Sequence, residues 1–245
     1  MKLNTDRLII RDVFSYDIEA CHYNLLSKFG YNMSNIDRHN KLKRNIQIGK
    51  IMRDDETTKS RLRETTKQII DDYIEFNELL EEDIIIRQYD GLITKKRLLE
   101  TNKSILPIAM QNRYDIVLIS IDRNKYIAFD NLKKKVKIKG VPNLYKGIET
   151  YYKRLIRIVD IENKTRVLDN LQKLKSDFSN EKDINIFAIP TDNEEEVEII
   201  FKSFGQIKIK RNTLYYMIDD EIDKNFYYDF YLHSFIQSIV LETLS

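Results

Sequence analysis

The spacing of apolar residues predicts several helices along the chain. The clearest lies between Thr57 and Phe76, where apolar side chains recur at the three- and four-residue intervals of one helix face. Three acidic residues, 54–56, lie at the N-terminal end of this segment, and negative charge is stabilised at a helix N-terminus. Further helices are predicted at 20–29, 35–53, 144–158, 166–178, 194–201 and 230–244.

Short apolar runs and strict alternation predict the strands. Residues 7–16 are expected to form one long bent strand or a strand pair, and a tight turn at Asp90-Gly91 is expected to join two short strands. From Tyr114 onward the pattern becomes mainly β. Together the patterns predict an α+β fold with an antiparallel sheet and packed helices. The remaining strands are predicted at 84–87, 92–94, 116–120, 125–129 and 135–139, with a hairpin at 206–217.

Length and composition limit the kind of protein this can be, but they do not identify its function. A length of 245 residues allows one large domain or two or three small subdomains, and 42% apolar residues suffice for a core. The net charge of +2 balances 41 basic against 39 acidic residues, so local charge clusters matter more than the sum. A single cysteine, Cys21, excludes an intrachain disulfide and a zinc cluster of cysteines. We see no signal peptide or membrane span, so we expect a cytoplasmic protein, in the host cytoplasm if it is viral, with no membrane partner.

Two aspartates are candidates for metal binding. Asp17 follows the apolar run 8–14, and Asp90 follows the run 84–86. Strands that end in this way place carboxylates at a sheet edge, where two of them could share a divalent ion. An isolated aspartate at a strand end is usually a turn or cap residue, so neither position is informative without the other.

Both aspartates suit two-metal phosphoryl transfer, which needs three kinds of group. Carboxylates must bridge two divalent ions, cations must face a triphosphate, and a basic surface must follow the nucleic-acid backbone. Asp17 and Asp90 could provide the first, and Lys41, Lys43 and Arg44 the second. The third could come from Lys133, Lys134, Lys135, Lys137 and Lys139.

The lysines of 133–139 also have a purely structural interpretation. Lysines along an edge strand prevent it from pairing with other molecules. Lys135, Lys137 and Lys139 alternate with Val136 and Ile138, so their three ammonium groups are expected on one face of a strand. This arrangement is compatible with both roles.

Several short motifs resemble, in order, those of family B DNA polymerases. Tyr16-Asp-Ile-Glu-Ala-Cys-His-Tyr23 resembles motif A, Lys41-Leu-Lys-Arg-Asn-Ile-Gln-Ile-Gly49 resembles motif B, and Ile86-Arg-Gln-Tyr-Asp-Gly91 resembles motif C. Residues 123–126 and 138–140 are similar to the KKxY and IKG elements of the family. Residues 214–218 and 227–232 look like its thumb strand and closing helix. The colinear order is more specific than any single motif.

The resemblance implies a template-directed DNA polymerase with palm, reduced fingers and thumb. The palm would comprise 1–30 and 77–140, the reduced fingers and following palm helix 31–76, and a mixed helical and β thumb 141–245. Asp17, Asp90 and the carbonyl oxygen of Ile18 would hold two Mg²⁺ ions, which Mn²⁺ could replace. Nucleotide contacts would come from His22, Tyr23, Lys41, Arg44, Asn45 and Gly49, and DNA contacts from Arg123, Lys125, Tyr126, Lys135, Lys137 and Lys139.

The implied partners are primer-template DNA, a dNTP and a second polymerase subunit that carries exonuclease or N-terminal domains. Three positions depart from the family pattern. Gln88 replaces the first motif C aspartate, His22 stands where motif A has tyrosine, and Ile48 stands where motif B has tyrosine. These departures leave a second hypothesis, in which the chain is a catalytically inactive, polymerase-like subunit that binds primer-template DNA and scaffolds a replication complex.

Overall fold

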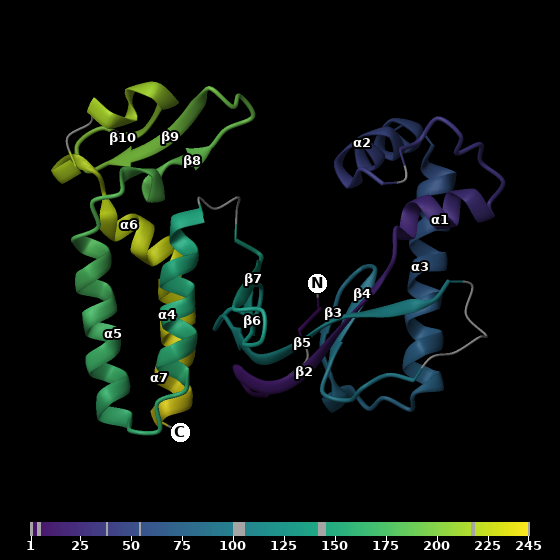
Figure 1. Ribbon diagram of the computed structural model, residues 1–245, viewed down its shortest axis with the longest axis horizontal. Helices are drawn as coiled ribbons and strands as arrows, with labels where there is room; N and C mark the ends of the chain where they lie inside the picture. The colour runs from purple at the N-terminus through teal and green to yellow at the C-terminus, as the bar shows by residue number, and fades with distance from the viewer. Residues whose placement is uncertain are drawn as a thin grey trace. The chain divides into compact units, whose positions relative to one another are not determined.

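The computed structural model describes residues 2–3, 6–37, 39–53, 55–99, 106–141, 146–216 and 219–244. The chain forms two compact units (Figure 1). Unit 1 comprises 1–5 and 12–113, and unit 2 comprises 6–11 and 114–245. Strands β2 (Ile9–Ile18) and β5 (Ile108–Ile119) contribute residues to both. The division into palm, fingers and thumb stays a prediction, whereas the α+β class with an antiparallel sheet is confirmed.

The sheet of unit 1 contains the acidic turn that the sequence predicts. Its antiparallel strands follow the order β1 (Lys2–Leu3), β3 (Ile84–Arg87), β4 (Gly91–Thr94), β2. Residues 88–90 connect β3 to β4, so the turn before Gly91 is where we expected it. Residues 9–18 form one long strand rather than a strand pair.

The described residues of unit 1 also form the α-helices α1 (Cys21–Lys28), α2 (Lys41–Met52) and α3 (Glu56–Phe76). A short 3-10 helix, Glu81–Asp83, precedes β3. The side chain of Asp55 caps α3 by accepting a 2.9 Å hydrogen bond from the amide of Thr58, whereas Asp54 lies outside the described residues. Leu62, Ile69 and Tyr73 of α3 share a buried core with Tyr16, Ile18 and Leu92 of the sheet. The apolar stripe of α3 therefore packs on the sheet.

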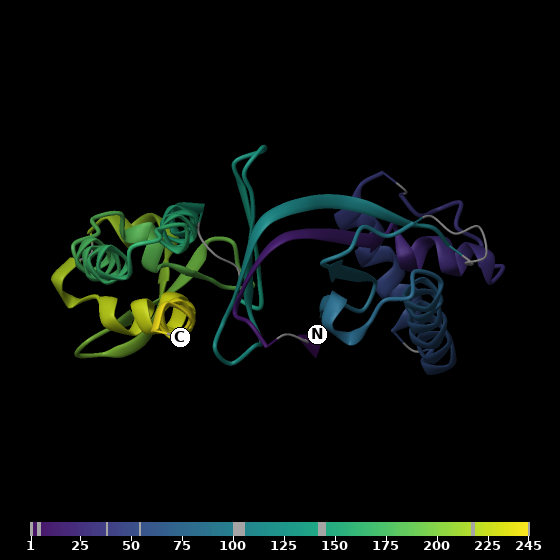
Figure 2. The same cartoon turned by 90° about the horizontal axis from the view of Figure 1, so that it is seen from below.

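Unit 2 continues from β5 into an antiparallel sheet with β6 (Tyr126–Asp130) and β7 (Lys135–Lys139). Its helices α4 (Glu149–Val159), α5 (Lys164–Ser179) and α7 (Ser234–Leu244) lie side by side (Figures 1 and 2). The helix α6 (Lys224–Tyr228) and a π-helical turn, Asp229–His233, lead into α7.

One buried core joins the sheet of unit 2 to these helices. The sheet and the helices each contribute apolar side chains that are almost fully buried. Those from the sheet include Ile116, Leu118 and Ile127, and those from the helices include Leu155, Leu174 and Phe235.

A second, three-stranded sheet in unit 2 corrects two predictions. It has the order β10 (Gly205–Lys210), β9 (Glu196–Phe201), β8 (Ile189–Pro190). The prediction of a helix over 194–201 is wrong, because Val197, Ile199 and Phe201 are buried in strict alternation along β9. The predicted hairpin 206–217 is also wrong, because β10 pairs with the strand that precedes it in the chain, β9, and not with residues that follow it.

The 3-10 helices of unit 2 are Lys146–Ile148, Ile184–Phe187, Arg211–Tyr216 and Asp219–Glu221. The third of these occupies most of 214–218, where the resemblance implied a thumb strand, and residues 217 and 218 lie outside the described part of the chain. Among the described residues, no helix has both the length and the apolar character that a membrane span requires.

Candidate active site

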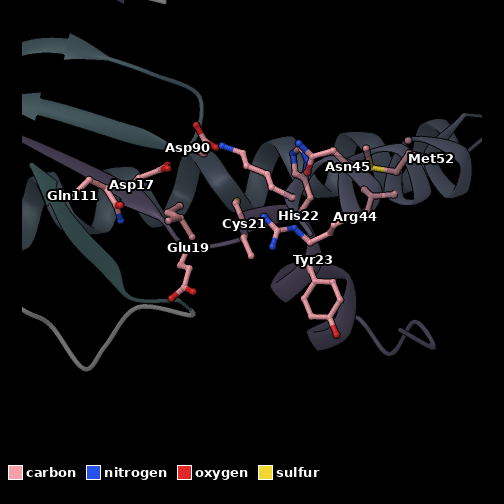
Figure 3. A pocket seen from close by; sticks show the side chains of 15 residues that line it. Asp17, Glu19, Cys21, His22, Tyr23, Arg44, Asn45, Met52, Asp90 and Gln111 are labelled. Carbon is pink, nitrogen blue, oxygen red and sulfur yellow. The ribbon is translucent and has the colours of Figure 1, made fainter. Parts of the chain in front are cut away.

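A pocket of about 460 Å³ lies in unit 1 where the end of the sheet meets α1 and α2 (Figure 3). Nine of its lining residues are those that the sequence singled out for metal or nucleotide binding. They come from three separate segments of the chain, and the fold brings all of them to one cavity. The nine are Asp17, Ile18, His22, Tyr23, Lys41, Arg44, Asn45, Gly49 and Asp90.

Backbone pairing places the two aspartates next to each other. Asp17 lies near the end of β2, opposite Gly91 in β4. The amide of Ile18 donates a 2.9 Å hydrogen bond to the carbonyl oxygen of Asp90, and the amide of Gln88 donates a 3.0 Å bond to the carbonyl oxygen of Gly91 across the turn. Because paired residues of antiparallel strands have Cα atoms about 4.5–5.5 Å apart, Asp17 and the residue after Asp90 are direct neighbours.

Gly91 allows this close approach of β2 and β4. A Cβ atom at this position would lie 2.4 Å from the carbonyl oxygen of Tyr16. The backbone of Gly91 is not in the left-handed region, which corrects the expectation that the glycine serves the tight turn itself. Glycine is needed here because β2 and β4 leave no space for a Cβ atom at the position next to Asp90.

The helix α2 forms the cationic side of the pocket. Asn40 caps it, with its side-chain oxygen accepting a 3.1 Å hydrogen bond from the amide of Lys43. Lys41, Arg44 and Asn45 follow the cap and line the pocket together with Gly49 one turn later. Residues three and four apart share a helix face, so one face of α2 presents two cations and an amide to the cavity.

His22 is held beside Asp90 by an aromatic contact. Its ring lies edge-on to that of Tyr89, with the centroids 5.6 Å apart. Burial lowers the pKa of His22, although the nearby Asp90 carboxylate acts in the opposite direction. His22 is therefore a neutral imidazole at pH 7, able to donate one hydrogen bond and accept another.

Cys21 lines the pocket but is not a nucleophile at neutral pH. Burial raises the pKa of its thiol to about 11, and the charges of Asp90 and Asp17 act in the same direction. Its sulfur lies 3.4 Å from the hydroxyl oxygen of Thr66. Cys21 is a buried free cysteine.

The oxygen donors of the pocket fit a hard divalent cation. Mg²⁺ is usually bound through one or two carboxylates, with substrate phosphates and water completing its octahedral shell. Asp17, Asp90 and the carbonyl oxygen of Ile18 are the donors that the sequence named for this role. Within the described residues, no group of three or more His, Cys, Asp or Glu side chains is placed to hold a metal.

The predicted DNA contacts all belong to unit 2. Lys135 and Lys139 are exposed on β7, and β7 is the last strand in the order of its sheet. The ammonium group of Lys125 lies 5.9 Å from the ring centroid of Phe230. Tyr126 is fully buried. Its side chain belongs to the core, which corrects the expected DNA contact at that position.

Some lining residues were missed by the sequence analysis. Gln111 reaches the pocket from β5, in a part of the strand that lies before the predicted start at 116. Most of residues 108–113 are exposed, so they lack the alternation that marks a half-buried strand. The other lining residues that we did not assign to the site are Glu19, Ala20, Cys21, Ile48 and Met52.

No protein-family model and no curated protein matches this sequence. Among solved structures, the chain is similar to the family B DNA polymerase from the hyperthermophilic archaeon Pyrobaculum calidifontis, with a TM-score of 0.48 and 11% sequence identity. The match covers 97% of this chain and 46% of the polymerase, so the chain spans about half of that protein's length. The similarity is distant, and the functional interpretation depends on the residues of the pocket.

Proposed function

We propose that the chain is a template-directed DNA polymerase that transfers a nucleotide from a dNTP to a primer 3′-hydroxyl by two-metal phosphoryl transfer. The observation that carries this proposal is the convergence of Asp17 and Asp90 with Lys41 and Arg44 around one pocket. Carboxylates on one side and cations on the other match a site for a metal-bound triphosphate.

Each group has a separate role in this proposal. Asp17 and Asp90 would supply the negative charge that holds divalent ions, whose chemistry when bound would be to activate the attacking oxygen and stabilise the leaving group. Lys41 and Arg44 neutralise the triphosphate, and Asn45 and Gly49 border the nascent base pair. His22, as a neutral imidazole, contacts the nucleotide without repelling or neutralising charge.

The test is primer extension with purified protein, Mg²⁺, dNTPs and primer-template DNA. Extension that requires both the template and the divalent ion supports the proposal. A protein that binds primer-template but never extends it, alone or with Mn²⁺, favours the inactive scaffold instead. Gln88 is the observation behind that second candidate, since motif C then has one aspartate where the family has two.

We expect Lys41→Ala to raise the apparent KM for dNTP by about 10- to 100-fold, because a hydrogen bond to a charged group contributes about 1.5–3 kcal/mol. The affinity for primer-template should change little, since Lys41 lines the nucleotide pocket. Steady-state incorporation and DNA-binding titrations measure the two quantities. Lys28→Ala, which removes an exposed lysine of α1, is the control. A fall in DNA affinity with an unchanged KM would assign Lys41 to the DNA surface.

We expect replacement of Lys135, Lys137 and Lys139 by Gln to weaken duplex DNA binding alike for all sequences. The slope of log K against log salt should flatten by about 0.9 for each phosphate that the variant no longer neutralises. The alternative role of these lysines, protection of an edge strand, predicts an unchanged slope and a more aggregation-prone variant. Salt titrations and light scattering on the same triple variant distinguish the two roles.

A further inference from the structure

The helix α2 has a second exposed face besides the one that lines the pocket. At about 100° per residue, Leu42, Lys43, Ile46, Lys50 and Arg53 fall within an arc of about 100°. We call these five residues the outward stripe. Arg53 belongs to it because its backbone continues the helical conformation. Lys41, Arg44, Asn45 and Gly49 lie on the pocket side of the same helix.

The outward stripe exposes two large apolar side chains to solvent. Leu42 is 70% exposed and Ile46 is 51% exposed. They stand one turn apart, so their side chains are neighbours on the helix surface. The residue of α2 that is buried is Ile48, on the other side. Leu42 and Ile46 therefore form an exposed apolar surface with cationic side chains beside it.

The charge around the stripe is strongly positive. Residues 41–53 contain five lysines and arginines and no acidic residue. The carboxylate of Asp37 lies near Lys43, but it already accepts hydrogen bonds from the amides of His39 and Asn40, at 3.0 and 2.9 Å. Asp55 is engaged with Thr58 at the start of α3. The stripe thus favours a polyanion over a neutral or basic partner.

The outward stripe is continuous with the pocket through Gly49. A Cβ atom at Gly49 would meet no atom within 4 Å, so the surface there is open. On the helix, Gly49 lies about 20° from Leu42, at the border of the two faces. The border between the pocket and the outward stripe therefore carries no side chain at Gly49.

We infer that the outward stripe binds an unpaired nucleic-acid strand. Lys43, Lys50 and Arg53 contact its phosphates, and Leu42 and Ile46 pack against the faces of its bases. From Lys43 to Arg53 the helix rises about 15 Å, which is enough for a short length of strand rather than a single phosphate. An acidic protein would also suit the charge, but Gly49 both lines the pocket and borders the stripe, which favours a polymer that occupies both faces. The inference rests on the proposed function in taking the occupant of the pocket to be nucleic acid.

The experiment measures binding of a fluorescent oligothymidylate by anisotropy at several salt concentrations, without nucleotide or divalent ion. In the charge variant, Lys43→Gln, Lys50→Gln and Arg53→Gln, we expect the slope of log K against log salt to flatten by about 2, at about 0.7 for each phosphate contact on a single strand. In the apolar variant, Leu42→Ser and Ile46→Ser, we expect binding about five- to thirtyfold weaker with an unchanged slope.

Matched controls come from unit 2. Lys164→Gln, Arg166→Gln and Lys173→Gln remove two lysines and an arginine from exposed positions of α5, and Leu168→Ser with Leu241→Ser removes two exposed leucines. Thermal melting confirms that each variant is folded. The inference is overturned if the parent protein does not bind the strand, or if the stripe variants behave like their controls. The inference is also overturned if the stripe variants weaken binding of an acidic protein but not binding of the strand.

This experiment separates the stripe from the proposed chemistry. The binding assay contains no nucleotide and no divalent ion, so its result does not depend on nucleotide incorporation. If the parent fails to extend a primer while strand binding still depends on the stripe, the polymerase proposal fails and the stripe assignment stands.

Discussion

Asp17→Asn and Asp90→Asn should each lower the rate of nucleotide incorporation by at least about 10²–10³-fold, the effect of removing one strong electrostatic contact to a transition state. Each change removes a charge that would bind a divalent ion, while the volume of the side chain is kept. Single-turnover extension assays with Mg²⁺ measure the decrease. Because both carboxylates would serve one metal centre, the double variant should be little worse than either single variant.

The same variants should keep their fold and their affinity for primer-template. Asp72→Asn is a suitable control in unit 1, because an asparagine oxygen can still accept the 2.7 Å hydrogen bond from Gln68. We expect this control to extend primers at the parental rate. Full activity of Asp17→Asn or Asp90→Asn would refute the assignment of the pocket, and an equal decrease in the control would point to a general effect of charge.

Gly91→Ala should both destabilise unit 1 and lower incorporation. The new methyl group would lie 2.4 Å from the carbonyl oxygen of Tyr16, so β4 must move away from β2. Forced overpacking of this kind costs about 1–3 kcal/mol, which corresponds to a fall in melting temperature of roughly 2–12 °C for a chain of this size. The movement also separates Asp90 from Asp17, so the rate should fall even at temperatures where the variant is fully folded.

Gly49→Ala is the matched control for stability. It adds the same methyl group, but in the interior of α2 and with no atom within 4 Å. Alanine is favoured over glycine inside a helix by about 0.5–1 kcal/mol, so this variant should melt higher than the parent. If the melting temperatures of the two variants shift in the same direction, the close approach of β2 and β4 does not determine the stability of Gly91→Ala.

Local patterns determined most of the secondary structure of this protein. The spacing of Leu62, Ile69 and Tyr73 predicted α3, and the apolar run before Asp90 predicted a strand that ends in a turn. These features depend on neighbouring residues in the chain, which is why they can be seen without the fold. The order of the short motifs likewise singled out Asp17, Lys41 and Asp90 before their convergence in space was known.

Local helix preference failed where strand pairing and burial in the core decide the conformation. Glu194, Glu195 and Glu196 are good helix formers, and they favoured a helix at 194–201. Residues 196–201 instead form β9, because pairing of β9 with β10 and burial of its alternate side chains outweigh that preference.

The sequence alone thus determined which residue types are available for the site, and the tertiary structure decided how they are used. The role of Gly91 depends on the backbone of β2, the contact of His22 depends on Tyr89 in another segment, and Gln111 enters the pocket from β5. The burial of Tyr126 likewise depends on the elements that cover its sheet. All four follow from segments that are far apart in the chain and close in space, and short-range spacing carries no information about such pairs.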